Sequence, residues 1–230
     1  ASDVLPMPPP ELRALMLVSG VFWTIAYVLI LVRAHRDRRY GMPLLALAAN
    51  LSWELTFAVV TPHSGPQMIV NGVWLALDVL LAVQFLRFAH VDFPTLSVTA
   101  LRLLFTIAVV TAFGLVSLSV LEFDDRLGAY SAFGMNLLMS ISFLFMLFRR
   151  RSLAGQSTAI ALFKLLGTLF ASIADFIFRY VLLGLHERER VLPLFLYGAI
   201  FFFDVVYLVL VVREKRAPWF TAAHPASESA

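Results

Sequence analysis

The sequence contains no cysteine among its 230 residues. This absence excludes disulfide bonds, metal sites with thiolate ligands and cysteine nucleophiles. Charged residues are also scarce, at 14% of the chain, whereas a typical soluble domain has about 25%. The first residues, ASDVLPMPPPELRAL, lack the basic stretch that opens a signal peptide, so we expect no cleavable signal.

Hydrophobic residues are abundant instead, at 60% of the chain. They form runs of about 20 residues, the length that crosses a bilayer as a helix. The sequence therefore predicts an all-α fold, a seven-transmembrane helix bundle that forms a single integral membrane domain over 1–230, with flexible termini at 1–12 and 217–230. The expected spans are 13–32, 42–61, 67–88, 99–121, 128–148, 157–184 and 192–212.

Basic residues gather on alternate connections between these spans. They occur in RAHRDRRYG after the first span, RRR after the fifth and REKR after the seventh, whereas TPHSGPQ, EFDDRLG and HERER are poor in basic charge or balanced. The positive-inside rule then predicts a multi-pass protein with its N-terminus outside and its C-terminus in the cytoplasm. The net charge of +3 is explained by topology, so we expect a lipid membrane as partner and no nucleic acid.

Two halves of the chain resemble each other weakly. GVWLALDVLLAVQFLR (72–87) matches GAIFFFDVVYLVLVVR (198–213), and AANLSWELTF beside LFASIADFIF aligns Glu54 with Asp175. This pattern predicts two three-helix repeats, spans 1–3 and 5–7, joined by a linker helix. Chance similarity between apolar helices is the alternative.

Acidic residues occur inside four of the predicted spans, where ionisable groups are costly and mark functional sites by default. These residues are Glu54, Asp78, Asp175 and Asp204. At a helix rise of ~1.5 Å per residue they lie roughly 12–17 Å below the outer edge of the membrane. Asp175 has Arg179 four residues later, the favourable order for a structural ion pair. Lys164 lies nearer the cytoplasmic end, where its side chain is expected to reach the interface.

Glu54 and Asp204 have no basic residue within a turn on their own helices. Burial without a partner disfavours a charged carboxylate. The sequence therefore predicts that both are unpaired and protonated, and makes each a candidate general acid.

Other polar and aromatic residues share the same depth. Asn50 could hold the Glu54 carboxyl group or simply link two helices. Asp78 could bind the substrate or form a hydrogen bond with a neighbouring helix. Aromatic faces stabilise cations, although most aromatic residues of such a protein serve packing or face lipid. The predicted substrate-binding residues are Asn50, Trp53, Trp74, Asp78, Phe201 and Tyr207.

The pieces YGMPLLALAANLSWELTF and WLALDV, in a chain of this length, resemble the membrane-integral terpene cyclases of meroterpenoid and indole-diterpene biosynthesis. The resemblance covers residues 15–213. It implies catalytic acids in the second and last spans, which fall on Glu54 and Asp204, and it assigns no role to Asp175.

The resemblance also implies a reaction of isomerase or lyase type in secondary metabolism. A carboxylic acid protonates the terminal alkene or epoxide of a prenyl chain, of farnesyl length or longer, attached to a polar head group. The carbocation then closes rings until it loses a proton or meets a nucleophile. No metal or cofactor is implied, in agreement with the lack of DDxxD and DxDD motifs. The prenylated substrate is expected to arrive from the bilayer, with a prenyltransferase and an epoxidase as possible pathway partners.

A small-molecule transporter is the main alternative, because two three-helix repeats and the tripeptide GPQ (65–67) resemble PQ-loop carriers. Those carriers place Pro-Gln within a helix and usually in both halves, and the fifth span has no counterpart. A retinal protein is disfavoured because the last span contains no lysine for a Schiff base. A receptor or scaffold is disfavoured by the short loops.

Overall fold

The computed structural model describes residues 9–63, 65–125, 127–182 and 191–217, and these residues contain helices and no strands. The all-α prediction is therefore confirmed. The helices are α1 (Pro10–Asp37), α2 (Leu44–Leu55), α3 (Pro66–Asp92), α4 (Val98–Glu122), α5 (Ala129–Arg150), α6 (Thr158–Phe176) and α7 (Val191–Arg216). Two π-helical segments, η1 (Thr56–Val60) and η2 (Ile177–Leu182), continue α2 and α6.

Among the described residues, six stretches of helix are long and apolar enough to cross a membrane, and they correspond to six of the predicted spans. The predicted second span corresponds to a shorter apolar helix, Leu44–Val60. Within the predicted N-terminal flexible segment, helix α1 already begins at Pro10. Nearly all of the rest of that segment and of 217–230 lies outside the described residues.

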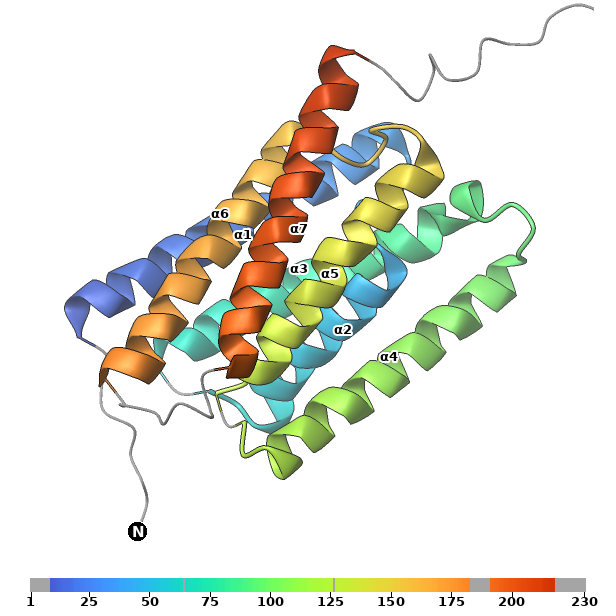
Figure 1. Cartoon of the computed structure of the whole chain (residues 1–230). Coiled ribbons are helices and arrows are strands. Elements are labelled where there is room, and N and C mark those ends of the chain that lie inside the picture. Colours follow the sequence, from blue (N-terminus) through green and yellow to red (C-terminus); the bar gives the residue numbers. More distant parts are fainter. Residues whose placement is uncertain (1–8, 64, 126, 183–190, 218–230) are drawn as a thin grey trace, which may run out of the picture.

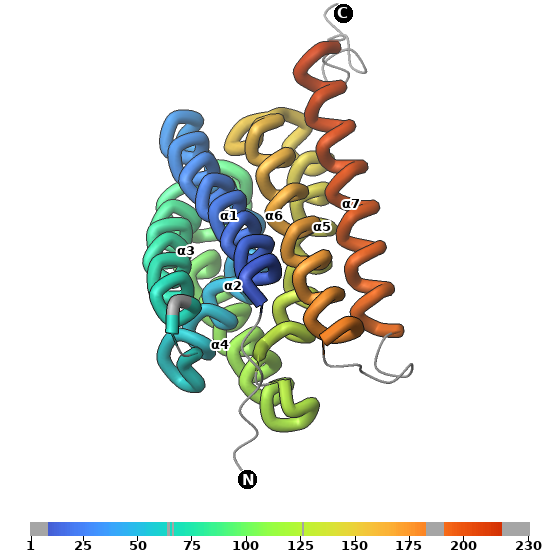
Figure 2. Tube along the Cα trace, turned by 90° about the vertical axis from the view of Figure 1, so that its left-hand side faces the viewer, coloured from blue at the N-terminus to red at the C-terminus, as the bar shows by residue number. Residues whose placement is uncertain are grey.

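The helices run up and down the bundle in alternation (Figure 1). Helix α1 packs along α6, and α2 lies in the interior against α3, α4 and α5 (Figure 2). Helix α2 is short but buries Asn50, Ser52, Trp53 and Glu54. Its interior position means that its polar side chains face protein rather than lipid.

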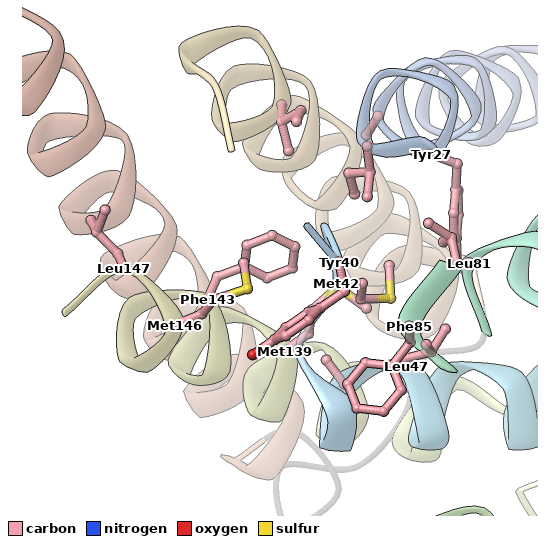
Figure 3. Close-up of a cluster of buried hydrophobic side chains, with 14 of the residues drawn as sticks. Tyr27, Tyr40, Met42, Leu47, Leu81, Phe85, Met139, Phe143, Met146 and Leu147 are labelled. Carbon is pink, nitrogen blue, oxygen red and sulfur yellow. The ribbon is translucent and has the colours of Figure 1, made fainter. Parts of the chain in front are cut away.

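The hydrophobic core fills the half of the bundle that ends in the arginine-rich connections. Leu47 of α2, Phe85 of α3 and Phe143 of α5 are all fully buried there, and Figure 3 shows them converging from their separate helices. Tyr27 of α1 and Met139 of α5 belong to this cluster and also line the cavity described below. This cluster therefore ties α2, α3 and α5 together near the arginine-rich connections.

An ionic cluster closes the arginine-rich end. Asp92, at the end of α3, accepts hydrogen bonds from Arg39 and Arg150, and the Arg149 guanidinium lies 3.7 Å from the centre of the Phe93 ring. These contacts join the connection after α1 to the ends of α3 and α5. The arginines from which the topology was predicted therefore also hold helix ends together.

The pair Asp124-Asp125 lies in the connection before α5. Asp125 is buried and accepts hydrogen bonds from the Tyr130 and Ser131 amides, at 3.2 and 2.9 Å. It therefore satisfies otherwise unpaired amides in the first turn of α5. At the start of α3, Pro66 is the first helical residue, so the Pro-Gln pair opens that helix rather than interrupting it.

Candidate active site

A cavity of about 410 Å³ lies between the helices in the half of the bundle opposite the core. This volume is within the range of small-molecule pockets, about 300–1,000 Å³. Its wall comes from α1, α2, α3, α5 and α6, from η2, and from the connections before α3 and α5. The residues that line it are Met16, Ser19, Trp23, Tyr27, Asn50, Trp53, Glu54, His63, Gln67, Trp74, Leu127, Gly128, Ala129, Ala132, Phe133, Met135, Asn136, Met139, Ala171, Ala174, Asp175 and Phe178.

Glu54 faces this cavity from the last turn of α2. Its side chain is only 1% exposed, and its Oε2 atom has no hydrogen-bond partner within the described part of the chain. Over the same residues Glu54 forms no salt bridge. The carboxyl group predicted from sequence to be buried and unpaired is therefore in that environment.

Asn50 lines the cavity one turn before Glu54 but does not hold its carboxyl group. Its Nδ2 atom donates to the Tyr27 hydroxyl and, at 2.7 Å, to Oδ2 of Asp78. Of the two roles predicted for Asn50, the structure shows the link between helices and records no Asn50–Glu54 hydrogen bond among the described residues. Asp78 is fully buried behind Asn50 and links α3 to α2, and it does not itself line the cavity.

Both predicted tryptophans line the cavity. The Trp53 indole N–H donates to the Gly128 carbonyl at 2.9 Å, and the Trp74 indole N–H donates to the Thr24 hydroxyl at 3.0 Å. These bonds fix the orientation of each ring. Trp53 also packs on Phe57, with ring centres 4.7 Å apart. The apolar wall near Glu54 is thus made of aromatic rings held in place.

Asp175 lines the same cavity from α6. Its Oδ2 atom accepts from Nε of Arg179, at 2.8 Å, and from the Tyr197 hydroxyl. The ion pair predicted from the spacing of these two residues is confirmed. Arg179 also lies over the Tyr130 ring, with its Cζ atom 4.5 Å from the ring centre. The cavity therefore contains one unpaired carboxyl group and one carboxylate held by a cation.

A π-helical segment begins two residues after each of these acids. Glu54 precedes η1 and Asp175 precedes η2 by the same interval. In η1 the Phe57 carbonyl accepts from the His63 amide and the Asn71 side chain, both at 3.2 Å. These partners satisfy a carbonyl that a regular helix would bond within itself. Such wide turns occur frequently at functional sites.

Asp204 lies elsewhere and is not unpaired. It forms a salt bridge with Lys164 of α6, and each of the two side chains is 1% exposed. Lys164 also donates to Ser140 of α5, at 2.7 Å. Two expectations are therefore wrong: Lys164 does not reach the interface, and Asp204 has a buried cationic partner. A charged pair compensates the burial of each member, so neither residue needs access to water.

None of the described residues of α4 or α7 lines the cavity, so Asp204, Phe201 and Tyr207 do not meet Glu54 there. Phe201 is 47% exposed on the outer side of α7. Tyr207 is buried in α7, and its hydroxyl donates at 2.9 Å to the side chain of Gln156, which lies in the connection between α5 and α6. Roles of these three residues in catalysis and substrate binding stay predictions.

Several cavity residues were not singled out from the sequence. Trp23 and Tyr27 lie four residues apart in α1, and Asn136 of α5 donates to Thr168 at 2.9 Å. Polar groups in the middle of an apolar span were the available signal. Within the described ranges, no group of three or more His, Asp and Glu side chains is arranged to hold a metal ion.

Comparison with known proteins identifies the family. The family model of Pyr4-like transmembrane terpene cyclases matches residues 9–217, nearly the whole chain. The chain belongs to this family. The family assignment confirms the resemblance found in the sequence, and the comparisons give no support to a transporter.

Curated relatives from fungi carry names of the same kind. The Pyr4-family terpene cyclase mfmH of Annulohypoxylon moriforme is 29% identical over 72% of this chain and 70% of its own length. Terpene cyclase andB of Emericella variicolor is 29% identical over 66% of each chain. Terpene cyclase dpfgB of Gibberella zeae is 30% identical over 84% of this chain and 79% of its own. No solved structure matches the chain.

Proposed function

We propose that this chain is a membrane-bound terpene cyclase in which Glu54 starts the reaction by protonation. The acid adds its proton to the terminal alkene or epoxide of a prenyl chain carried on a polar head group. The observation that carries the proposal is the single unpaired, buried carboxyl group in an otherwise largely apolar cavity. Burial without a cation favours its neutral form, which is the form that donates a proton.

The aromatic wall supports carbocation chemistry. Trp53, Trp74 and Tyr27 line the cavity around the α2 acid, and the electron-rich faces of such rings attract positive charge. An apolar, closely packed wall also excludes water, which would otherwise capture the cation before the rings close. Asn50 and the buried Asp78 orient the Tyr27 hydroxyl within this wall.

The resemblance ties Asp204 to the reaction as well. Since its carboxylate is bound to Lys164 and does not line the cavity, we propose it as a positioning residue. It would hold α7 against α6, and through Lys164 and Ser140 it would fix α5, which supplies much of the cavity wall.

We further propose that Leu44–Val60, the second helical segment of the chain, also crosses the membrane and brings the number of spans to seven. Its length lies at the lower limit for a membrane helix, about 17 residues, and its burial among α3, α4 and α5 reduces contact with lipid. The charge distribution supports an N-terminus outside and a C-terminus in the cytoplasm. The prenylated substrate would then reach the cavity from the bilayer, after a prenyltransferase and, for epoxide substrates, an epoxidase have made it.

The two-repeat arrangement gains support from geometry. Contacts of α3 with α1 and α2 have counterparts in those of α7 with α5 and α6, and the α2–α5 contact corresponds to the α6–α1 contact. The acids aligned in the sequence, Glu54 and Asp175, each precede a π-helical segment and line one cavity. We therefore propose that the cavity lies between two related halves, with α4 as the linker.

The test is cyclisation of farnesylated aromatic compounds and farnesylated cyclic dipeptides by membranes that contain the protein. Glu54→Gln should lower product formation by about 10²-fold or more, the typical contribution of a general acid. Glu122→Gln, which changes an exposed acid at the end of α4, is the matched control and should keep full activity. A metal chelator should not change the cyclisation rate of the wild type or of Glu122→Gln. Wild-type activity of Glu54→Gln at equal protein level would overturn the assignment.

A further inference from the structure

The second acid of the cavity, Asp175, is held in a way that leaves one oxygen unused. Its Oδ2 atom accepts both available hydrogen bonds, from Arg179 and Tyr197. The Oδ1 atom has no hydrogen-bond partner within the described part of the chain, yet it does not belong to the fully buried atoms without a partner. A carboxylate oxygen is therefore available at the cavity wall.

Glu54 and Asp175 differ in the partner that each has. Glu54 has no cation near it, whereas Asp175 is paired with Arg179 at 2.8 Å. An adjacent guanidinium favours the ionised form of a carboxyl group, and isolation in an apolar wall favours the neutral form. Two acids in opposite protonation states in one site form the usual arrangement of a proton donor with a proton acceptor.

A protonation-initiated cyclisation that ends by proton loss needs both a proton donor and a proton acceptor. The positive charge starts at the distal end of the prenyl chain and moves toward the head group with each carbon–carbon bond that forms. The final cation therefore lies several carbons away from the atom that received the proton. The donor touches only the first of these positions, so a base elsewhere in the cavity wall is needed to remove a proton from the last.

We propose that Asp175 is this base, a second catalytic residue that ends the reaction; the inference rests on the proposed function. A C–H bond beside the final cation breaks, its electron pair forms the new carbon–carbon double bond, and the proton passes to Oδ1 of Asp175. One proton enters from Glu54 and one leaves to Asp175, so substrate and product are isomers. After product release, proton exchange with solvent restores both acids.

Neighbouring residues keep the acceptor in place. The Tyr197 hydroxyl comes from α7, and the Arg179 guanidinium comes from η2 and lies over Tyr130 of α5. Bonds from two different elements to Oδ2 hold the carboxylate in place at the cavity wall and leave Oδ1 without a hydrogen bond from the described residues.

The experiment uses the whole protein in membranes and the farnesylated substrate that the wild type cyclises. Asp175→Asn keeps the size of the side chain but removes its basicity. Substrate consumption should stay within about threefold of wild type, because protonation by Glu54 is unchanged. The share of the wild-type alkene among the products should fall by about tenfold or more, since a general base typically contributes at least about 10²-fold to its step. Alcohols from water capture and products of earlier proton loss should replace it. Asp175→Glu should restore part of the alkene.

Asp175→Asn leaves Arg179 buried without its charge partner, and this alone can impair folding. The double variant Asp175→Asn with Arg179→Gln removes that penalty and should give the same altered product ratio. A higher KM with an unchanged product ratio would identify a head-group anchor and overturn the proposal. An equal loss of consumption and of all products in the folded double variant would identify a structural role and overturn it as well.

A wild-type product without a new double bond would overturn this inference and leave the proposed function intact. Failure of the wild type to cyclise any prenylated substrate would overturn the proposed function itself. The two failures are therefore distinguished by the wild-type product alone.

Discussion

At the scale of single residues, buried carboxyl groups lie in two different electrostatic environments in this protein. Glu54 is buried without a cation, whereas Asp204 is buried against Lys164. A carboxyl group of the first kind can donate a proton, and one of the second kind is a carboxylate with a structural partner. The chemistry of each acid therefore depends on what a neighbouring helix brings to it.

The Asp204–Lys164 pair gives a prediction about stability. Asp204→Asn should lower the free energy of unfolding by about 3–5 kcal/mol, because it leaves a buried ammonium group uncompensated. Replacing both residues with apolar ones, Lys164→Met with Asp204→Leu, should regain most of that loss. Unfolding in detergent micelles, followed by circular dichroism, measures both effects.

The same double variant separates positioning from chemistry. If Asp204 acts through Lys164 on the helix packing, the folded Lys164→Met, Asp204→Leu variant should cyclise substrate at a rate within about tenfold of wild type. This corresponds to an increase of at most about 1.4 kcal/mol in the activation free energy. A stable double variant with no cyclase activity would instead assign Asp204 to the chemical step.

Gly128 gives a second prediction at this scale. It has a positive φ of 66°, and a Cβ atom there would lie 2.5 Å from the Phe57 ring and 2.9 Å from Trp53. Gly128→Ala should cost about 1–3 kcal/mol of stability and displace Trp53 from the cavity wall, so cyclisation should fall too. Gly134→Ala in α5, where no atom lies within 4 Å, is the control and should gain about 0.5–1 kcal/mol. Equal stability of the two variants would contradict the expected crowding.

At the scale of elements, helix ends are held by charge and the interior by packing. Asp92 ends α3 and binds Arg39 before α2 and Arg150 at the end of α5. The Asp92 and Arg150 side chains are only 7% and 4% exposed. Partly desolvated charges of this kind interact more strongly than pairs on an open surface.

Asp92→Asn should therefore lower the melting temperature clearly, with a loss of about 3 kcal/mol or more for a broken buried pair. The control is Arg33→Gln, which breaks an i,i+4 pair with Asp37 whose arginine side chain is 35% exposed, and it should cost about 0.5 kcal/mol or less. Similar melting temperatures for the two variants, measured by differential scanning fluorimetry, would show that the α3 cluster contributes no more than a surface pair.

At the scale of the whole molecule, one end of the bundle is packed and basic and the other contains the cavity. The cavity wall includes His63 and Gly128 from connections that are poor in arginine. If the positive-inside rule holds for this chain, the cavity lies in the outer half of the membrane.

The lack of cysteine allows a direct test of this orientation, because the wild type gives no labelling background. Pro62→Cys and Thr95→Cys place single thiols at exposed positions on opposite ends of the bundle. A membrane-impermeant maleimide added to intact cells should label Pro62→Cys at once and Thr95→Cys only after permeabilisation. The reverse pattern would invert the proposed topology.

The sequence by itself determined the membrane class, the helical fold and most helix limits, because hydropathy and charge are local properties of the chain. It also determined the Asp175–Arg179 pair, since residues four apart on one helix are neighbours in any tertiary arrangement. The lack of a cation close to Glu54 on its own helix followed in the same way.

Only the tertiary structure decided which helices face one another. It brought Lys164 to Asp204, turned Asn50 toward Tyr27 and Asp78, and placed Glu54 and Asp175 in one cavity from which α7 is absent. These pairings depend on the rotation and packing of helices far apart in the chain, and local hydrophobic periodicity contains no information about that rotation in spans apolar on nearly every side.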